Sequence, residues 1–188
     1  MPRRKIKFRA GEVYHVYNRG VNRQPIFFCR ENWLYYIRQL KRYFRTELAD
    51  ILAYCLMPNH YHLMIQLKID QLGEKIMQPL GIAFTKAVNS QQGRVGPIFQ
   101  GPFKGVEVST DEQLVHLSRY IHLNPVRAGL VDNAEAWEFS SYREMLGLCK
   151  ATVCNPEPVL AYFASRQAYR EFVEDDQEAD VIQPVMLA

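Results

Sequence analysis

The spacing of apolar residues predicts alternating strands and helices in the first part of the chain. Residues 11–18 alternate in polarity and end at a turn signal, which predicts a first strand. Residues 30–48 carry apolar side chains at helical spacing. Two apolar runs, 50–56 and 60–67, predict a hairpin, because Pro58 lies in the short turn between them.

The same alternation continues in the second part of the chain. Residues 72–90 look helical, although a proline and two glycines delay the expected start to about Gln78. Residues 103–108 predict a fourth strand. Residues 109–110 fit the capping box of another helix. We expect Asn124-Pro125 to kink or end that helix, because a residue before proline avoids the α region.

The order strand, helix, strand, strand, helix, strand, helix indicates an α+β fold. We expect a ferredoxin-like sandwich, with an antiparallel sheet and helices on one side. The domain organisation that we expect is a basic arm at 1–10, one domain at 11–148, a helical extension at 149–170 and an acidic, flexible tail at 171–188.

Length and composition favour a cytoplasmic globular protein. The chain has 188 residues, of which 48% are hydrophobic, and this suits one ordinary domain. Its longest apolar runs are too short to cross a bilayer, and no apolar segment follows the basic N-terminus to serve as a signal peptide. The four cysteines are scattered, without the spacing of a zinc ribbon or a redox site.

The net charge of +3 hides an uneven distribution. Residues 171–188 contain six acids and no base, so removing their −6 from the total leaves +9 for residues 1–170. A basic domain of this kind is a candidate for binding a polyanion. The alternative is an ordinary solvated surface followed by a tail.

Two pairs of residues could carry chemistry. His60 and His62 lie two residues apart on a predicted strand, so their side chains share one face. Their Cα atoms should lie about 7 Å apart. They could converge on one divalent cation if another element supplies a further ligand, or they could simply be hydrogen-bonded. Tyr120 and Asn124 lie one helical turn apart on one face, although most tyrosines on helices serve packing.

Five sequence blocks occur together over roughly residues 10–146. They are Val16-Tyr17-Asn18-Arg19-Gly20, Cys55-Leu56-Met57-Pro58-Asn59-His60-Tyr61-His62-Leu63, Phe99-Gln100-Gly101-Pro102-Phe103-Lys104, Arg119-Tyr120 through Gly129, and Trp137-Glu138-Phe139-Ser140-Ser141-Tyr142. In this order they resemble the single-tyrosine HUH transposases, and most closely the REP-associated tyrosine transposases. The resemblance also implies the ferredoxin-like fold.

The resemblance implies a specific chemistry. His60 and His62 would bind Mg²⁺ or Mn²⁺, and Asn124 holds the place of a polar ligand that is often glutamine in related enzymes. Tyr120 would attack single-stranded DNA, leaving a 5′-phosphotyrosine and a free 3′-hydroxyl. A phenol has an ordinary pKa of about 10, so the attack needs assistance from the cation.

The implied partner is single-stranded DNA with hairpin structure, and no membrane. Relatives include both dimers and monomers, so the chain is expected to be either a monomer or a homodimer. The basic residues in or near the blocks are candidates for phosphate contacts: Arg19, Arg23, Lys104, Arg119 and Arg127.

Two other functions remain open from the residues alone. One is a metal-dependent hydrolase of another substrate that uses the same histidines, with Tyr120 only structural. The other is a non-catalytic module that binds DNA hairpins. Both predict that no covalent adduct with DNA forms.

Overall fold

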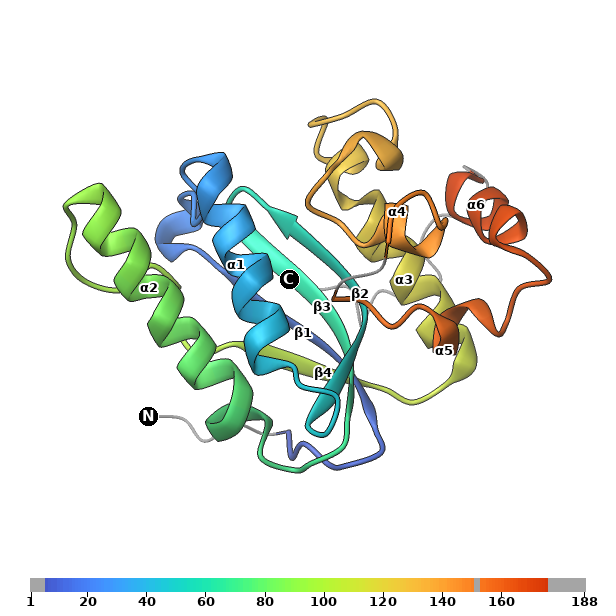
Figure 1. Ribbon diagram of the computed structural model, residues 1–188, viewed down its shortest axis with the longest axis horizontal. Coiled ribbons are helices and arrows are strands. Elements are labelled where there is room, and N and C mark those ends of the chain that lie inside the picture. Colours follow the sequence, from blue (N-terminus) through green and yellow to red (C-terminus); the bar gives the residue numbers. More distant parts are fainter. Residues whose placement is uncertain (1–5, 151–152, 176–188) are drawn as a thin grey trace.

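Four strands form one antiparallel sheet in the computed structural model, which describes residues 6–150 and 153–175 (Figure 1). The strands lie in the order β2-β3-β1-β4. Their bounds are Val13–Arg19 for β1, Ala49–Met57 for β2, His60–Leu67 for β3 and Lys104–Val108 for β4. With one helix between β1 and β2 and another between β3 and β4, this is the β-α-β-β-α-β order of the ferredoxin-like fold. The α+β prediction is confirmed.

The two helices of this repeat, α1 (Arg30–Tyr43) and α2 (Gln78–Gln92), cover one face of the sheet (Figure 1). A five-residue π-helical turn precedes α2, so the delayed start at Gln78 is confirmed. The ring of Tyr36 in α1 lies 5.4 Å from that of Tyr61 in β3 and 4.8 Å from that of Phe84 in α2. This aromatic contact places both helices on the face to which Tyr61 points.

Helix α3 (Asp111–Arg127) covers the opposite face. His62 follows Tyr61 on β3 and therefore points to the other side of the sheet, where its ring lies 5.4 Å from that of Tyr120. The expectation that the helices lie on one side of the sheet is confirmed for α1 and α2. It is corrected for α3, which covers the other side. The physical reason is that the middle of β3 is buried on both faces, and each face needs its own cover.

Helix α3 begins as its capping residues predict and ends later than expected. The side chain of Thr110 accepts a hydrogen bond from the main-chain N–H of Gln113. The helix does not end at Asn124-Pro125, because Pro125 lies inside its last turn. A proline removes only one main-chain donor, and the N–H of Ala128 still donates to the carbonyl oxygen of Asn124 at 3.0 Å.

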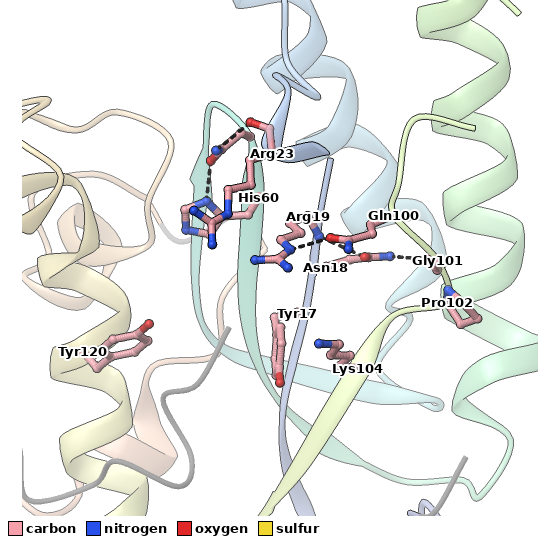
Figure 2. Close-up of a pocket in the computed structure, with 11 residues that line it drawn as sticks. Tyr17, Asn18, Arg19, Arg23, His60, Gln100, Gly101, Pro102, Lys104 and Tyr120 are labelled. Carbon is pink, nitrogen blue, oxygen red and sulfur yellow. Dashed lines mark hydrogen bonds between the residues drawn. The ribbon is translucent and has the colours of Figure 1, made fainter. Parts of the chain in front are cut away.

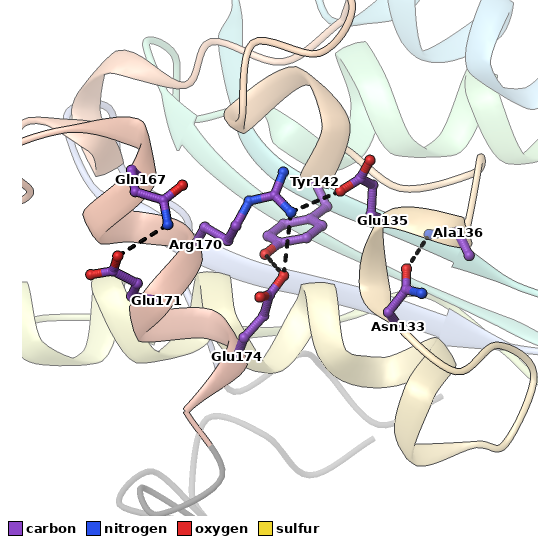
Figure 3. A network of polar contacts seen from close by, with 8 residues as sticks. All are labelled: Asn133, Glu135, Ala136, Tyr142, Gln167, Arg170, Glu171 and Glu174. Atoms are coloured by element: carbon purple, nitrogen blue, oxygen red, sulfur yellow. Dashed lines mark hydrogen bonds and ion pairs between the residues drawn. The ribbon is translucent and has the colours of Figure 1, made fainter.

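Short helices after α3 pack against it on this second face. A polar network links the first and last of them to the turn at 134–136: Arg170 pairs with Glu135 at 2.9 Å, and the Tyr142 hydroxyl donates to Glu174 at 3.1 Å (Figure 3). These helices are α4 (Tyr142–Met145), α5 (Glu157–Leu160) and α6 (Arg166–Glu174). The first acids of the expected tail therefore belong to α6.

The rest of the acidic tail, 176–188, and the first half of the basic arm, 1–5, lie outside the described residues. Within the described ranges, no helix is both long enough and apolar enough to cross a membrane.

Candidate active site

The strand register brings the predicted histidines beside two residues of β1. His62 lies opposite Tyr17 and His60 lies opposite Arg19 in the β1–β3 pair. Tyr17 is also the partner of Lys104 on β4. Residues directly opposite each other project to the same face, so all five side chains face α3.

A pocket of about 500 Å³ opens at this end of the sheet, beneath α3 (Figure 2). Figure 2 shows Tyr120 on α3 facing the histidine and the basic side chains across the pocket. The residues lining it include no aspartate or glutamate, so its charge is positive. They are Tyr17, Asn18, Arg19, Arg23, Asn59, His60, Gln100, Gly101, Pro102, Lys104 and Tyr120.

His60 lines the pocket, and its hydrogen bond with Asn59 determines its tautomer. Its Nδ1 lies 2.6 Å from Oδ1 of Asn59, whose amide nitrogen donates to the carbonyl oxygen of Arg23 at 3.1 Å. Since an amide oxygen can only accept, Nδ1 of His60 carries the proton and Nε2 carries a lone pair. Partial burial lowers the pKa of His60, which favours the neutral ring.

His62 lies deeper and is fully buried. Its ring centroid is 4.9 Å from that of His60, and its Nδ1 is 2.9 Å from Nε2 of His15. Burial lowers the pKa of His62 well below its ordinary value, and the neighbouring His15 and His60 lower it further. No hydrogen-bond partner within the described residues meets the buried Nε2 of His62.

Tyr120 and Asn124 complete the group from α3. Burial raises the pKa of Tyr120, while a hydrogen bond from Asn124 and the charge of Arg127 lower it in part. The guanidinium carbon of Arg127 lies 5.8 Å from the Tyr120 ring centroid. Asn124 also forms a hydrogen bond with His60, so the structure brings all four predicted chemical residues together.

These donors fit a divalent cation. Two imidazoles whose pKa values are lowered and one side-chain amide lie together, and the buried Nε2 of His62 lacks a partner within the described residues. Within the described residues, no third His, Cys, Asp or Glu side chain joins the two histidines to form a metal-binding cluster. The remaining coordination positions would therefore fall to phosphate oxygens and water.

Four of the five predicted phosphate-contact residues lie at or beside the pocket. Arg19, Arg23 and Lys104 line it, and Arg127 is exposed next to Tyr120. In the described part of the chain, none of the four pairs with a carboxylate. Their charges are thus available to a polyanion.

Arg119 is a correction to the predicted set. Its side chain is only 4% exposed, its Nε donates to the carbonyl oxygen of Val173 at 3.3 Å, and its guanidinium carbon lies 5.6 Å from the centroid of the Phe172 ring. Consecutive residues on a helix point about 100° apart, so Arg119 contacts α6 while Tyr120 faces the pocket.

Two residues at the site were missed by reasoning from the sequence. Asn59 lies in the predicted turn between the two strands, and its side chain orients the ring of His60. His15 contacts His62 from β1, and its signal was the alternation that places it two residues before Tyr17, on the same face of that strand.

Comparisons with known proteins show the family. The family model described as "Transposase IS200 like" matches residues 11–124, which is more than half of the chain. A protein of Haemophilus influenzae named as a REP-associated tyrosine transposase is 29% identical over 103 residues. That match covers 50% of this chain and 58% of the relative's length.

A solved structure supports the fold. It is described as a REP-associated tyrosine transposase bound to a REP hairpin, and it superposes with a TM-score of 0.61 at 20% sequence identity. The match covers 78% of this chain and 86% of that one. At this level of identity the likeness concerns the fold alone.

Proposed function

The chain belongs to the family of IS200-like transposases, and we propose that it cleaves and rejoins single-stranded DNA with Tyr120 as the nucleophile. The observation that carries the proposal is that Tyr120 and His60 line one basic pocket, while Asn124 and the buried His62 contact them from the pocket's wall. The four residues come from two elements on the same face of the sheet.

In the proposed reaction, Tyr120 attacks a phosphate held by the basic residues of the pocket. The phenol oxygen bonds to phosphorus, the bond to the 3′-oxygen breaks, and the phenol proton reaches the departing 3′-hydroxyl through water. Attack by an incoming 3′-hydroxyl on the phosphotyrosine reverses these steps and rejoins a strand. The energy of the phosphodiester is retained in the intermediate.

His60, His62 and Asn124 would hold the divalent cation. When bound there, Mg²⁺ or Mn²⁺ supplies a Lewis acid that polarises the phosphate. The two imidazoles add no negative charge, so they leave the positive charge of the pocket intact. The charge of Arg127 favours the phenolate of Tyr120 as its proton leaves.

The proposed substrate is a single strand next to a hairpin. The nucleophile is half-buried in a pocket beneath α3, and an unpaired strand can present its backbone there more easily than a duplex can. The structural relative described as bound to a REP hairpin supports the hairpin as the feature recognised. Arg19, Arg23, Lys104 and Arg127 are the proposed phosphate contacts.

A covalent-adduct assay tests the proposal. Single-stranded oligonucleotides from the DNA flanking the gene, with and without hairpins, would be mixed with protein and Mn²⁺ or Mg²⁺. A denaturing gel would then be read for a protein–DNA adduct. We expect an adduct that requires metal and disappears in Tyr120→Phe and in His60→Ala.

Tyr17→Phe is a matched control, because Tyr17 is a second tyrosine lining the same pocket. Its adduct should form as in the wild type. An adduct that survives Tyr120→Phe and is lost in Tyr17→Phe would show that the nucleophile is Tyr17. Tight hairpin binding without an adduct on any flanking strand would instead support a non-catalytic binding module.

A further inference from the structure

His15 lies behind the proposed metal site, on the central strand β1. Its side chain is fully buried, and its ring stacks on that of His62 with centroids 5.1 Å apart and planes inclined by 24°. Nε2 of His15 and Nδ1 of His62 are separated by 2.9 Å, which is a hydrogen-bond distance. Two buried histidines are therefore joined directly, without a carboxylate between them.

This hydrogen bond has two possible directions, and only one leaves His62 able to bind a cation. If Nδ1 of His62 donates to His15, then Nε2 of His62 carries a lone pair. If His15 donates instead, Nε2 of His62 carries a proton and cannot be a ligand. Nε2 of His62 has no partner within the described residues, so the first direction gives it a buried lone pair that a cation can use, and the second a buried proton that no cation can use.

We infer that His15 is a positioning residue that accepts a hydrogen bond from Nδ1 of His62 and so holds Nε2 of His62 ready for a divalent cation. This inference rests on the proposed function. The stacked geometry also restrains the His62 ring, since both rings are buried between the sheet and α3. Neighbours of this kind fix both the tautomer and the orientation of a histidine ligand.

The chemical nature of His15 has a further consequence. The acceptor behind a histidine ligand is often a carboxylate, which adds a negative charge to the site. A neutral imidazole adds none, and no acid lines the pocket. The full charge of the cation then remains to attract a phosphate, so cation and DNA should each strengthen the binding of the other.

Calorimetric titration with Mn²⁺ tests the inference on the full chain. His15→Phe keeps a ring of similar shape and removes the acceptor. We expect Mn²⁺ to bind this variant about 10–100-fold more weakly than the wild type. Its affinity for a hairpin oligonucleotide, measured in EDTA, should stay unchanged. His15→Gln restores an acceptor near the former position of Nε2 and should recover most of the Mn²⁺ affinity.

His122→Gln is the matched control, because His122 is equally buried but hydrogen-bonded to Tyr169 and Ser141, away from the pocket. It should bind Mn²⁺ like the wild type. Wild-type Mn²⁺ affinity in His15→Phe would overturn the inference, as would an equal loss in His122→Gln.

Nitrogen NMR of the wild-type protein provides a measurement that needs no variant and no metal. We expect the spectrum to report His62 as protonated on Nδ1, and a proton on Nε2 would overturn the inference. The adduct assay remains separate: a wild type that forms no adduct counts against the proposed function, whereas the tautomer of His62 decides the role of His15.

Discussion

The side-chain amide nitrogen of Asn124 donates a 2.8 Å hydrogen bond to the main-chain carbonyl oxygen of Tyr120. This bond ties the proposed ligand to the turn of α3 that carries the nucleophile. Within the amide, the oxygen carries the available lone pairs, so it is the atom that could bind a cation. The turn stays helical although Pro125 follows, so both side chains keep one face of the helix.

Replacing Asn124 with alanine should weaken the binding of the metal that cleavage requires. We expect the concentration of Mn²⁺ needed for half-maximal adduct formation to rise at least about tenfold, because one ligand is lost. Rates of adduct formation over a Mn²⁺ series measure this. Asn124→Asp keeps an oxygen and adds charge, so it should need no more Mn²⁺ than the wild type. An unchanged Mn²⁺ requirement in Asn124→Ala would exclude the ligand role.

Arg23 and Arg119 form a matched pair for testing the DNA-binding surface. Arg23 is exposed and lines the pocket, whereas Arg119 is buried against α6. In Arg23→Gln, the slope of log affinity for single-stranded DNA against log salt should fall by about 0.7, as expected when one phosphate contact is lost.

Arg119→Met should leave that salt slope unchanged, since its guanidinium faces α6. It should lower the free energy of unfolding by about 1–3 kcal/mol, because the carbonyl oxygen of Val173 loses its donor. Fluorescence titrations at several salt concentrations and denaturant unfolding measure the two effects. A reduced slope in Arg119→Met would place Arg119 back among the phosphate contacts.

The charge of Arg127 should support Tyr120 as a nucleophile. Arg127 lowers the pKa of Tyr120, which burial otherwise raises. Arg127→Gln should therefore raise that pKa, slow adduct formation near pH 7.5 and move the rising limb of the pH–rate profile to higher pH. Arg127→Lys keeps the charge and should resemble the wild type. Identical pH profiles for the two variants would show that charge at this position does not assist the reaction.

Acid should destabilise the protein partly through His122. Burial lowers the pKa of His122 to about 3, against about 6.5 in an unfolded chain. Below pH 6.5 the unfolded state therefore binds more protons than the folded state. The contribution of His122 to the free energy of unfolding is full above that pH and is lost as the pH falls. Between pH 7 and pH 5, protonation of this histidine alone should lower the free energy of unfolding by about 2 kcal/mol.

His122→Gln removes the titrating group and can still hydrogen-bond with Tyr169 and Ser141. The free energy of unfolding of this variant should therefore depend less on pH over the same interval, by about the same 2 kcal/mol. Denaturant unfolding at the two pH values measures the difference. Equal pH dependence in variant and wild type would mean that His122 does not carry the effect.

Much of the fold and part of the site follow from local sequence pattern. Alternation and helical spacing placed all four strands and the three long helices near their actual bounds. The strand period of two placed His60 and His62 on one face, and helical spacing did the same for Tyr120 and Asn124. The family resemblance, rather than spacing, singled out Tyr120 among 11 tyrosines.

The sequence by itself therefore determined the elements and the faces on which their chemical side chains lie, because both depend on neighbours a few residues away. Only the tertiary structure decided that α3 crosses to the far face of the sheet, that Arg119 contacts α6, and that His15 meets His62 across 47 residues of chain. Those outcomes depend on strand order and on which buried surfaces pack together. Contacts between distant segments set both, and local periodicity carries no record of them.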